Sequence, residues 1–281
     1  QVLTSPTAIP YQPVQSFTID VNGNGLNDLV LVWSDSNNNL SYAILFSNLD
    51  GFGDLVMGNP TQLSYYGYTP GLQTVDINGD GRGDLVYFFL DDDNNLNYAT
   101  FISNGKNFEV SGTLQTGLQF NENPRVIPMD ISGNGSSDIV IPFGVNGFLS
   151  LQVLLSNGSE YHPNTIATPT LFPILDSIYE INLMPVNITG SPMQDLIYSY
   201  WDNGMMYMIS LISNGTGFIP SAPFSYPLTD TGISPPRLIP INLNGDGLSD
   251  IALSRQTSSG SVLDLFISDG FLLHHPELPT F

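Results

Sequence analysis

The stretch Asp76-Ile-Asn78-Gly-Asp80-Gly-Arg82-Gly-Asp84, which runs directly into the apolar segment 85–90, sets the pattern of the whole chain. The same order of features occurs five times: an acidic or amide residue, a glycine-rich turn, an aspartate and an apolar run. The copies begin at Asp20, Asp76, Asp130, Asn187 and Asn242, so successive copies lie 56, 54, 57 and 55 residues apart. A fixed period of this size indicates a repeat architecture, in which each repeat supplies one supersecondary unit.

The repeats leave no room for anything else. Five units of this length account for nearly all of the 281 residues, so residues 1–281 are predicted to form a single domain. The apolar runs are short, and none approaches the roughly 20 residues of a membrane-spanning helix. We therefore expect no membrane insertion.

Composition excludes several classes of function. The chain has 26 acidic and 5 basic residues, a formal net charge of −21, which disfavours binding to phosphate backbones or anionic lipid. We expect part of this acidity to serve solubility and part to ligate cations. There is no cysteine, so disulfides and thiol chemistry are excluded.

Each repeat is predicted to be a four-stranded antiparallel meander. In the second repeat, segments 72–76, 85–90 and 96–102 are rich in β-branched and aromatic residues, and a weaker run follows Phe108. No segment has a sustained helical period, so the chain should be all-β. A second recurring feature, a tight Asn-Gly or Asp-Gly turn followed by an aromatic, fixes the turn between third and fourth strands. These turns begin at Ser47, Ser103, Ser156, Ser213 and Ser268.

Four-stranded units repeated around an axis make a β-propeller, which protects its sheet edges by closing into a ring. The prediction is a five-bladed propeller with the glycine-rich loops between the first and second strands of each blade. Segment 1–15 is expected to complete the sheet of the last blade. A β-solenoid is the competing architecture, but its coils are usually shorter than these repeats.

The pattern Asp-x-Asn-Gly-Asp-Gly-x-x-Asp before an apolar strand resembles the FG-GAP, or VCBS, repeat of integrin α-subunit propellers. Fungal propeller lectins and the propeller regions of bacterial toxin-complex B components carry similar repeats, and segment 125–161 is most similar to the toxin type. The resemblance covers the whole chain. It implies a propeller fold and calcium binding more strongly than it implies a particular partner.

The loop itself has the chemistry of a cation site. Oxygen-bearing side chains at positions 1, 3, 5 and 9, with glycines at 4 and 6, are able to wrap around one centre, and hard oxygen donors in a flexible shell suit Ca²⁺. The predicted ligands are Asp20, Asn22, Asn24 and Asp28; Asp76, Asn78, Asp80 and Asp84; Asp130, Ser132, Asn134 and Asp138; and Asn242, Asn244, Asp246 and Asp250.

The loops are predicted to differ in affinity. The second loop offers three carboxylates and should bind best. The fourth loop has Asp195 as its sole acid and Pro192 in place of a glycine, so it is expected to be empty. The alternative for any of these loops is an Asx-rich turn that hydrogen-bonds its own backbone without a metal.

Ligand binding is expected on the opposite face, where the second-to-third turns and the connections between blades emerge. Variable polar tips occur there at 34–39, 91–95, 144–147, 202–204 and 256–260. Trp33 and Trp201 adjoin two of these tips, and Tyr65 and Tyr66 lie in a connection between blades; each is a candidate for stacking on a sugar ring. The alternative for such aromatics, favoured for Phe89 and Phe143, is packing between blades.

No catalytic constellation is visible, and the chain is predicted not to be an enzyme. The leading hypothesis is a calcium-stabilised, extracellular, multivalent lectin that binds glycans or glycoproteins. A protein-interaction propeller in adhesion or toxin assembly is the second hypothesis, and a glycan-cleaving enzyme with paired carboxylates is the third. Four Asn-x-Ser/Thr sequons, and Gln1 as the remnant of a cleaved signal sequence, favour secretion.

Overall fold

Every regular element in the described part of the chain is a β-strand, as the short apolar runs predict. We describe the protein from a computed structural model, over residues 15–65, 71–163, 168–174, 182–228, 236–270 and 273–274, with only the backbone considered at 168–171. No helix in these ranges is long and apolar enough to cross a membrane.

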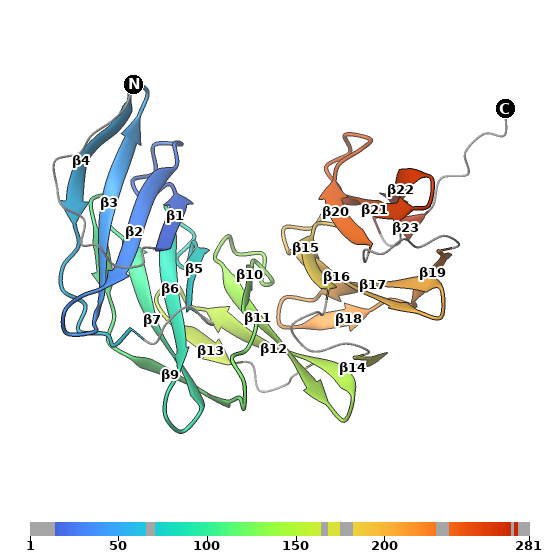
Figure 1. Cartoon of the computed structure of the whole chain (residues 1–281), viewed down its shortest axis with the longest axis horizontal. Coiled ribbons are helices and arrows are strands. Elements are labelled where there is room, and N and C mark those ends of the chain that lie inside the picture. Colours follow the sequence, from blue (N-terminus) through green and yellow to red (C-terminus); the bar gives the residue numbers. More distant parts are fainter. Residues whose placement is uncertain are drawn as a thin grey trace. The chain divides into compact units, whose positions relative to one another are not determined.

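The strands form five antiparallel sheets that follow one another along the sequence (Figure 1). The first sheet contains β1 (Gln15–Ile19), β2 (Asp28–Ser34), β3 (Leu40–Asn48) and β4 (Gly51–Met57). The second contains β5 (Gly71–Val75), β6 (Asp84–Leu90), β7 (Asn95–Ser103), β8 (Phe108–Val110) and β9 (Leu114–Gln119). The third contains β10 (Ile127–Met129), β11 (Asp138–Val145), β12 (Phe148–Ser156), β13 (Tyr161–Pro163) and β14 (Thr168–Pro173). The fourth contains β15 (Asn182–Val186), β16 (Asp195–Asp202), β17 (Met205–Ser213), β18 (Phe218–Pro220) and β19 (Phe224–Pro227). The fifth contains β20 (Arg237–Ile241), β21 (Asp250–Thr257), β22 (Gly260–Ser268) and β23 (Leu273–His274).

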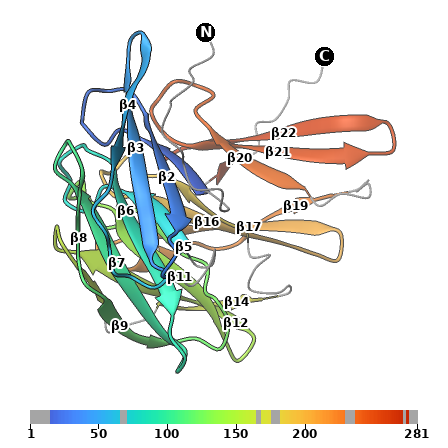
Figure 2. The same ribbon diagram turned by 60° about the vertical axis from the view of Figure 1, so that its left-hand side comes forward.

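Each sheet runs first, second, third, fourth strand in space, which is the predicted meander. The second and third strands of each sheet form a long hairpin. Figure 2 shows this hairpin clearly for β21 and β22 of the fifth sheet. The glycine-rich loop joins the first strand to the second in every repeat, and the recurring serine turn joins the third to the fourth. Five sequential sheets, each built on a four-stranded meander, define the five-bladed β-propeller fold class.

The outer strand of three sheets is broken, a detail that the sequence did not indicate. In the second sheet β8 pairs with one end of β7 and β9 with the other. Between them the Ser111 side chain accepts a hydrogen bond from Thr100 N at 2.9 Å. A side-chain oxygen thus replaces one backbone acceptor of the sheet, and the edge strand resumes after Gly112.

The chain divides into two compact units, and the third sheet contributes residues to both. In the first unit, the facing surfaces of the first two sheets pack Val30, Tyr42, Tyr87 and Phe101 into one apolar core. In the second unit, the fourth and fifth sheets pack Ile197, Met208, Leu253 and Phe266 in the same way. β6 is buried along nearly its whole length, which explains why segment 85–90 reads as one apolar run.

One prediction concerns the N-terminal segment 1–15. Residues 1–14 of that segment lie outside the described residues, so their predicted role in completing the last sheet stays a prediction, whereas Gln15 begins β1 of the first sheet. Within the described residues the fifth sheet has a short fourth strand of its own, β23.

Candidate functional site

The aspartate that ends each glycine-rich loop is fully buried. Asp28, Asp84, Asp138, Asp195 and Asp250 all have 0% exposure. One carboxylate oxygen, Oδ1, accepts the backbone N–H of the serine that begins the later turn, as from Ser103 to Asp84 at 2.7 Å. The other, Oδ2, accepts an N–H from the second loop residue, as from Ile77 to Asp84 at 3.0 Å. This aspartate therefore connects the loop to the end of the third strand, a structural role that requires no cation.

The first loop residue is also hydrogen-bonded within the loop. In the second loop, Asp76 Oδ1 accepts the N–H groups of Gly79 at 2.8 Å and Asp80 at 3.2 Å, and Oδ2 accepts that of Gly81 at 2.9 Å. Gly79 and Gly81 have φ angles of 70° and 81°, which favour glycine. Asp20 makes the same three contacts in the first loop. The loop thus has the geometry of the Asx turn that the sequence left open, although a carboxylate oxygen with one N–H partner retains acceptor capacity.

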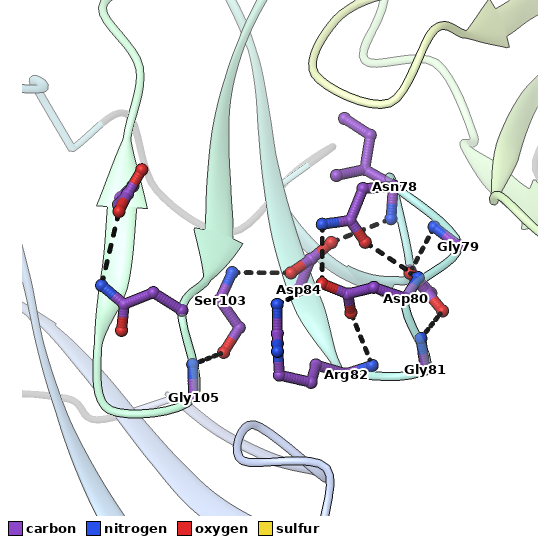
Figure 3. Close-up of polar contacts among 12 residues, drawn as sticks. Asn78, Gly79, Asp80, Gly81, Arg82, Asp84, Ser103 and Gly105 are labelled. Atoms are coloured by element: carbon purple, nitrogen blue, oxygen red, sulfur yellow. Dashed lines mark hydrogen bonds and ion pairs between the residues drawn. The ribbon is translucent and has the colours of Figure 1, made fainter.

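The second loop carries an internal ion pair, shown in Figure 3. Asp80 accepts a hydrogen bond on Oδ1 from its neighbour Arg82 N at 2.9 Å and on Oδ2 from Asn78 Nδ2 at 2.9 Å. The Arg82 guanidinium forms a very short ion pair with the same Oδ2 atom. The side chains remain 35% and 27% exposed, so this is a partly solvated pair.

Negative charge accumulates in this loop despite the ion pair. Burial raises the pKa of Asp84, two backbone hydrogen bonds lower it, and the nearby carboxylates of Asp76 and Asp80 add a smaller rise, so that the pKa lies at about 6. A cation among these groups would relieve the repulsion.

The loops differ in how well their oxygen atoms suit a cation. No group of three or more His, Cys, Asp or Glu side chains in the described ranges is arranged to hold a metal ion. Calcium, however, also accepts amide and backbone carbonyl oxygens, and loops one, two, three and five offer these beside at least one carboxylate at position 1 or 5. In the third loop, Ser132 Oγ donates to Asp130 Oδ1 at 3.4 Å. In the fourth loop positions 1 and 5 are Asn187 and Ser191, and the sole carboxylate, Asp195, is buried and hydrogen-bonded like its equivalents in the other loops, so this donor set does not fit a cation.

Successive loops are joined to each other. Backbone N–H groups at the eighth loop position donate to the first-position carbonyl of the preceding repeat, as from Gly83 N to Asp20 O and from Gln194 N to Asp130 O, each at 2.6 Å. The turn serine adds a second bond to the preceding loop, as from Ser213 Oγ to Ile131 O at 2.8 Å. The loops therefore hold neighbouring sheets together within each unit.

A polar cavity of about 270 Å³ lies on the tip side of the first unit. Its walls come from the connection after the first sheet and from the tip and outer strand of the second sheet. The lining residues are Gln62, Leu63, Ser64, Phe89, Asp91, Asn97, Thr113 and Gln115. This confirms that a second-to-third turn and a connection between blades meet on one side.

Asp91 is fixed at the entrance to the β6–β7 turn. Its carboxylate accepts Asn95 N at 2.9 Å and Asp93 N at 3.0 Å, and the Asn97 amide donates to it at 3.0 Å. These bonds, with the Asn95 side-chain amide first, lower the pKa of Asp91, so the cavity carries a stable negative charge.

The remaining polar side chains of the cavity have unused hydrogen-bonding capacity. Within the described residues, Gln62, Thr113 and Gln115 make no side-chain hydrogen bonds, and Asn97 uses its amide nitrogen alone. Gln62 has a φ of 56°, unusual for a residue other than glycine and a form of strain that clusters at functional sites. Phe89 supplies an apolar wall and is held by stacking on Tyr87, with ring centroids 5.2 Å apart.

The aromatic residues predicted to stack on a sugar differ in their exposure to solvent. Trp33 is 4% exposed and packs with Leu31 and Ala43, so its prediction as a stacking residue is corrected to a core role. Tyr65 is partly buried and stacks on Tyr87, with centroids 6.4 Å apart and planes at 14°. Trp201 is 49% exposed at the end of β16 and stays available. Tyr66 lies outside the described residues.

Sequence reasoning missed most of the cavity. Asp91 belongs to a tip that the sequence marked as polar, but Phe89 was assigned to packing, and Gln62, Thr113 and Gln115 were not marked at all. Gln62 follows Thr61, whose hydroxyl donates to Leu40 O at 2.5 Å, and Thr116 makes the same bond to Leu96 O at 2.7 Å. The recurrence of this threonine in the first two repeats was the sequence signal that could have located the segments lining the cavity.

Solved structures share this fold. A lectin from Agrocybe aegerita, studied for specific recognition of non-reducing terminal N-acetylglucosamine, is 17% identical over 94% of this chain, with a TM-score of 0.59. The chain covers 65% of that protein, less than two thirds of its length. AofleA from Arthrobotrys oligospora is 13% identical over 89% of this chain and 68% of its own, with a TM-score of 0.48. A rhamnogalacturonan lyase from Bacillus licheniformis is 12% identical over 85% of this chain and 53% of its own, with a TM-score of 0.43.

The first likeness places the chain in the β-propeller class, and the two weaker ones carry no further argument. No protein-family model matches the chain, and no curated protein matches it. The resemblance to FG-GAP repeats therefore stays a sequence-based prediction.

Proposed function

We propose that this propeller is a carbohydrate-binding module, a lectin, whose ligand contacts the tip-side cavity of the first unit. The observation that carries the proposal is the set of cavity groups: one fixed carboxylate, three amides, two hydroxyls and one aromatic wall. Sugars present both hydroxyl groups and apolar ring faces, and a site for them needs a few oriented polar groups beside an apolar surface.

The likeness to the Agrocybe lectin is consistent with this proposal but shows the fold alone. Asp91 is the single acid among the described residues that line the cavity, whereas glycoside hydrolysis by the usual mechanism needs two carboxyl groups. This supports binding over cleavage. Release of reducing sugar from a bound glycan would favour the enzyme hypothesis instead.

Calcium is the second part of the proposal. We propose that Ca²⁺ binds at one or more of loops one, two and five, where Asp20, Asp76, Asp80 and Asp246 would supply carboxylates. A bound Ca²⁺ would neutralise clustered acids and stabilise the folded state by mass action. Loops of this kind usually need the calcium levels found outside cells, which favours a secreted protein.

A glycan array is the direct test. The wild-type protein should bind a defined set of glycans, and replacing both Gln62 and Gln115 by Ala should reduce the signal by about tenfold or more, because two hydrogen bonds to the ligand would be lost. Both side chains are solvent-facing and make no described hydrogen bonds, so the fold should persist.

The matched control is Asn37→Ala, an exposed amide on the tip of the first sheet outside the cavity. The control should bind like the wild type. A flat array for the wild type would instead favour the protein-interaction hypothesis. Equal binding by the double variant would show that the ligand sits elsewhere, with Trp201 as the next residue to test.

A further inference from the structure

The second and fifth loops have the same residues at positions 3–6 and 9 but differ in what surrounds one carboxylate. Both contain Asn-Gly-Asp-Gly at positions 3–6, and in both the asparagine amide donates to the aspartate, at 2.9 Å to Asp80 and at 2.8 Å to Asp246. The next residue is Arg82 in the second loop and Leu248 in the fifth. The loops also differ at positions 1, 2 and 8, but the residue at position 7 decides whether this aspartate has a cationic partner from its own loop.

Arg82 is held over its loop from two sides. Its guanidinium is paired with Asp80 Oδ2 (Figure 3), and its aliphatic stem lies against the preceding loop, where a Cβ on Gly23 would be 3.2 Å from Arg82 Cγ. Its Nε atom is buried and has no hydrogen-bond partner among the described residues. A guanidinium that stays in place with one N–H group unsatisfied is held by charge attraction and by the packing of its stem.

We propose that Arg82 is a tethered cation that competes with a divalent ion for Asp80. The second loop, which has the most carboxylates, would then be a weaker calcium site than its sequence predicts, and the fifth loop would be free of this competition. The inference rests on the proposed calcium binding and names the residue that controls occupancy of one loop.

Two reciprocal variants test the competition. Arg82→Leu gives the second loop the residue of the fifth, and Leu248→Arg does the reverse. Lys106→Leu is the control, since it removes an exposed positive charge in the turn after β7 that pairs with no described acid. Calorimetric titration with CaCl₂ after chelator treatment gives the number of ions bound and the affinity of each.

We expect Arg82→Leu to gain one bound ion or to tighten one site by about fivefold or more, because removing a paired positive charge strengthens cation binding. Leu248→Arg should lose or weaken one site, and Lys106→Leu should titrate like the wild type. Unchanged titration in Arg82→Leu, with binding intact elsewhere, would overturn the competition and leave Arg82 a packing role.

The experiments distinguish a failure of the proposed calcium binding from a failure of the proposed competition by Arg82. The absence of heat of binding in the wild type and in all variants would overturn calcium binding and this inference together. Glycan binding is measured separately and depends on the cavity, so a negative array with a normal calcium titration leaves the competition standing.

Discussion

The second and fourth loops each end in a buried aspartate, but they differ in most of their other side chains. Asp84 and Asp195 accept the same pair of backbone N–H groups, from the second loop residue and from the turn serine, at 2.7–3.1 Å. Yet the second loop adds Asp76 and Asp80, whereas the fourth has Asn187 and Ser191. The repeat therefore contains two separable functions: position 9 maintains the fold in every blade, and positions 1 and 5 give some loops an affinity for cations.

The largest effect should come from removing the shared aspartate where no cation is expected. Asp195→Ala removes the acceptor of three backbone N–H groups, those of Ile188, Thr189 and Ser213. The N–H groups of Ile188 and Ser213 are buried, and each such group left without a partner costs about 1–3 kcal/mol, so unfolding should become easier by about 2–6 kcal/mol or more. Urea denaturation with calcium or with chelator measures this. Asp202→Ala, a less buried acid at the end of the same strand, should change stability by under about 0.5 kcal/mol.

If the loss for Asp195→Ala is small, the buried aspartate is not the structural element of the repeat. The proposed structural role of position 9, which the two loops have in common, would then be wrong.

The second effect concerns protonation of Asp84. Its folded pKa of about 6 lies above the ordinary 3.8, so its contribution to stability is complete below pH 3.8 and is lost as pH rises through about 6. In chelator, the loss attributable to this group should be at most about 3 kcal/mol. Carbon-13 NMR of the Asp84 carboxyl group measures the titration directly.

A midpoint near 4 for Asp84 in calcium-free protein would contradict this expectation. Added calcium should lower the midpoint if the ion binds within the second loop, since a nearby cation favours the ionised form.

The third effect is the stability supplied by calcium. Free Ca²⁺ at 100 times its dissociation constant should stabilise the protein by about 2.7 kcal/mol per site, visible as a higher Tm than in chelator. Asp246→Asn should remove part of this response. Ser191→Ala in the fourth loop should leave it intact, and a loss there would show that the fourth loop also binds a cation.

The smallest effect should come from the bonds that join successive loops. Ser213→Ala removes the hydroxyl that donates to Ile131 O, and Ser103→Ala removes the one that donates to Val21 O. Each should cost about 1 kcal/mol, because a typical intramolecular hydrogen bond contributes that much. If thermal unfolding shows a similar loss of stability for both variants, repeats with and without extra acids in their loops are joined to their neighbours in the same way.

The strand order and turn positions followed from the sequence because they depend on local chemistry. Glycines such as Gly79 and Gly81 adopt positive φ where the loop bends, and the apolar run 85–90 forms a strand buried on both faces. The broken outer strands were not predictable, since they depend on Ser111 and Ser221 replacing a backbone partner across the sheet.

The candidate sites were predicted less completely. The loop residues were found, but the ranking of loops did not foresee that Arg82 folds back onto Asp80, because a side chain two positions away gives no sign of its direction. Trp33 was placed on a binding surface although it is buried, because alternation alone does not tell which face of a strand is covered.

By itself the sequence determined the five repeats, their β-meander and the oxygen-rich chemistry of the loops, since period, turn residues and side-chain type are written along the chain. The tertiary structure decided which oxygens are already used by backbone N–H groups, and that Gln62, Asp91 and Gln115, more than 50 residues apart at the extremes, line one cavity. The physical reason is that hydrogen-bond satisfaction and cavity formation depend on contacts between distant segments.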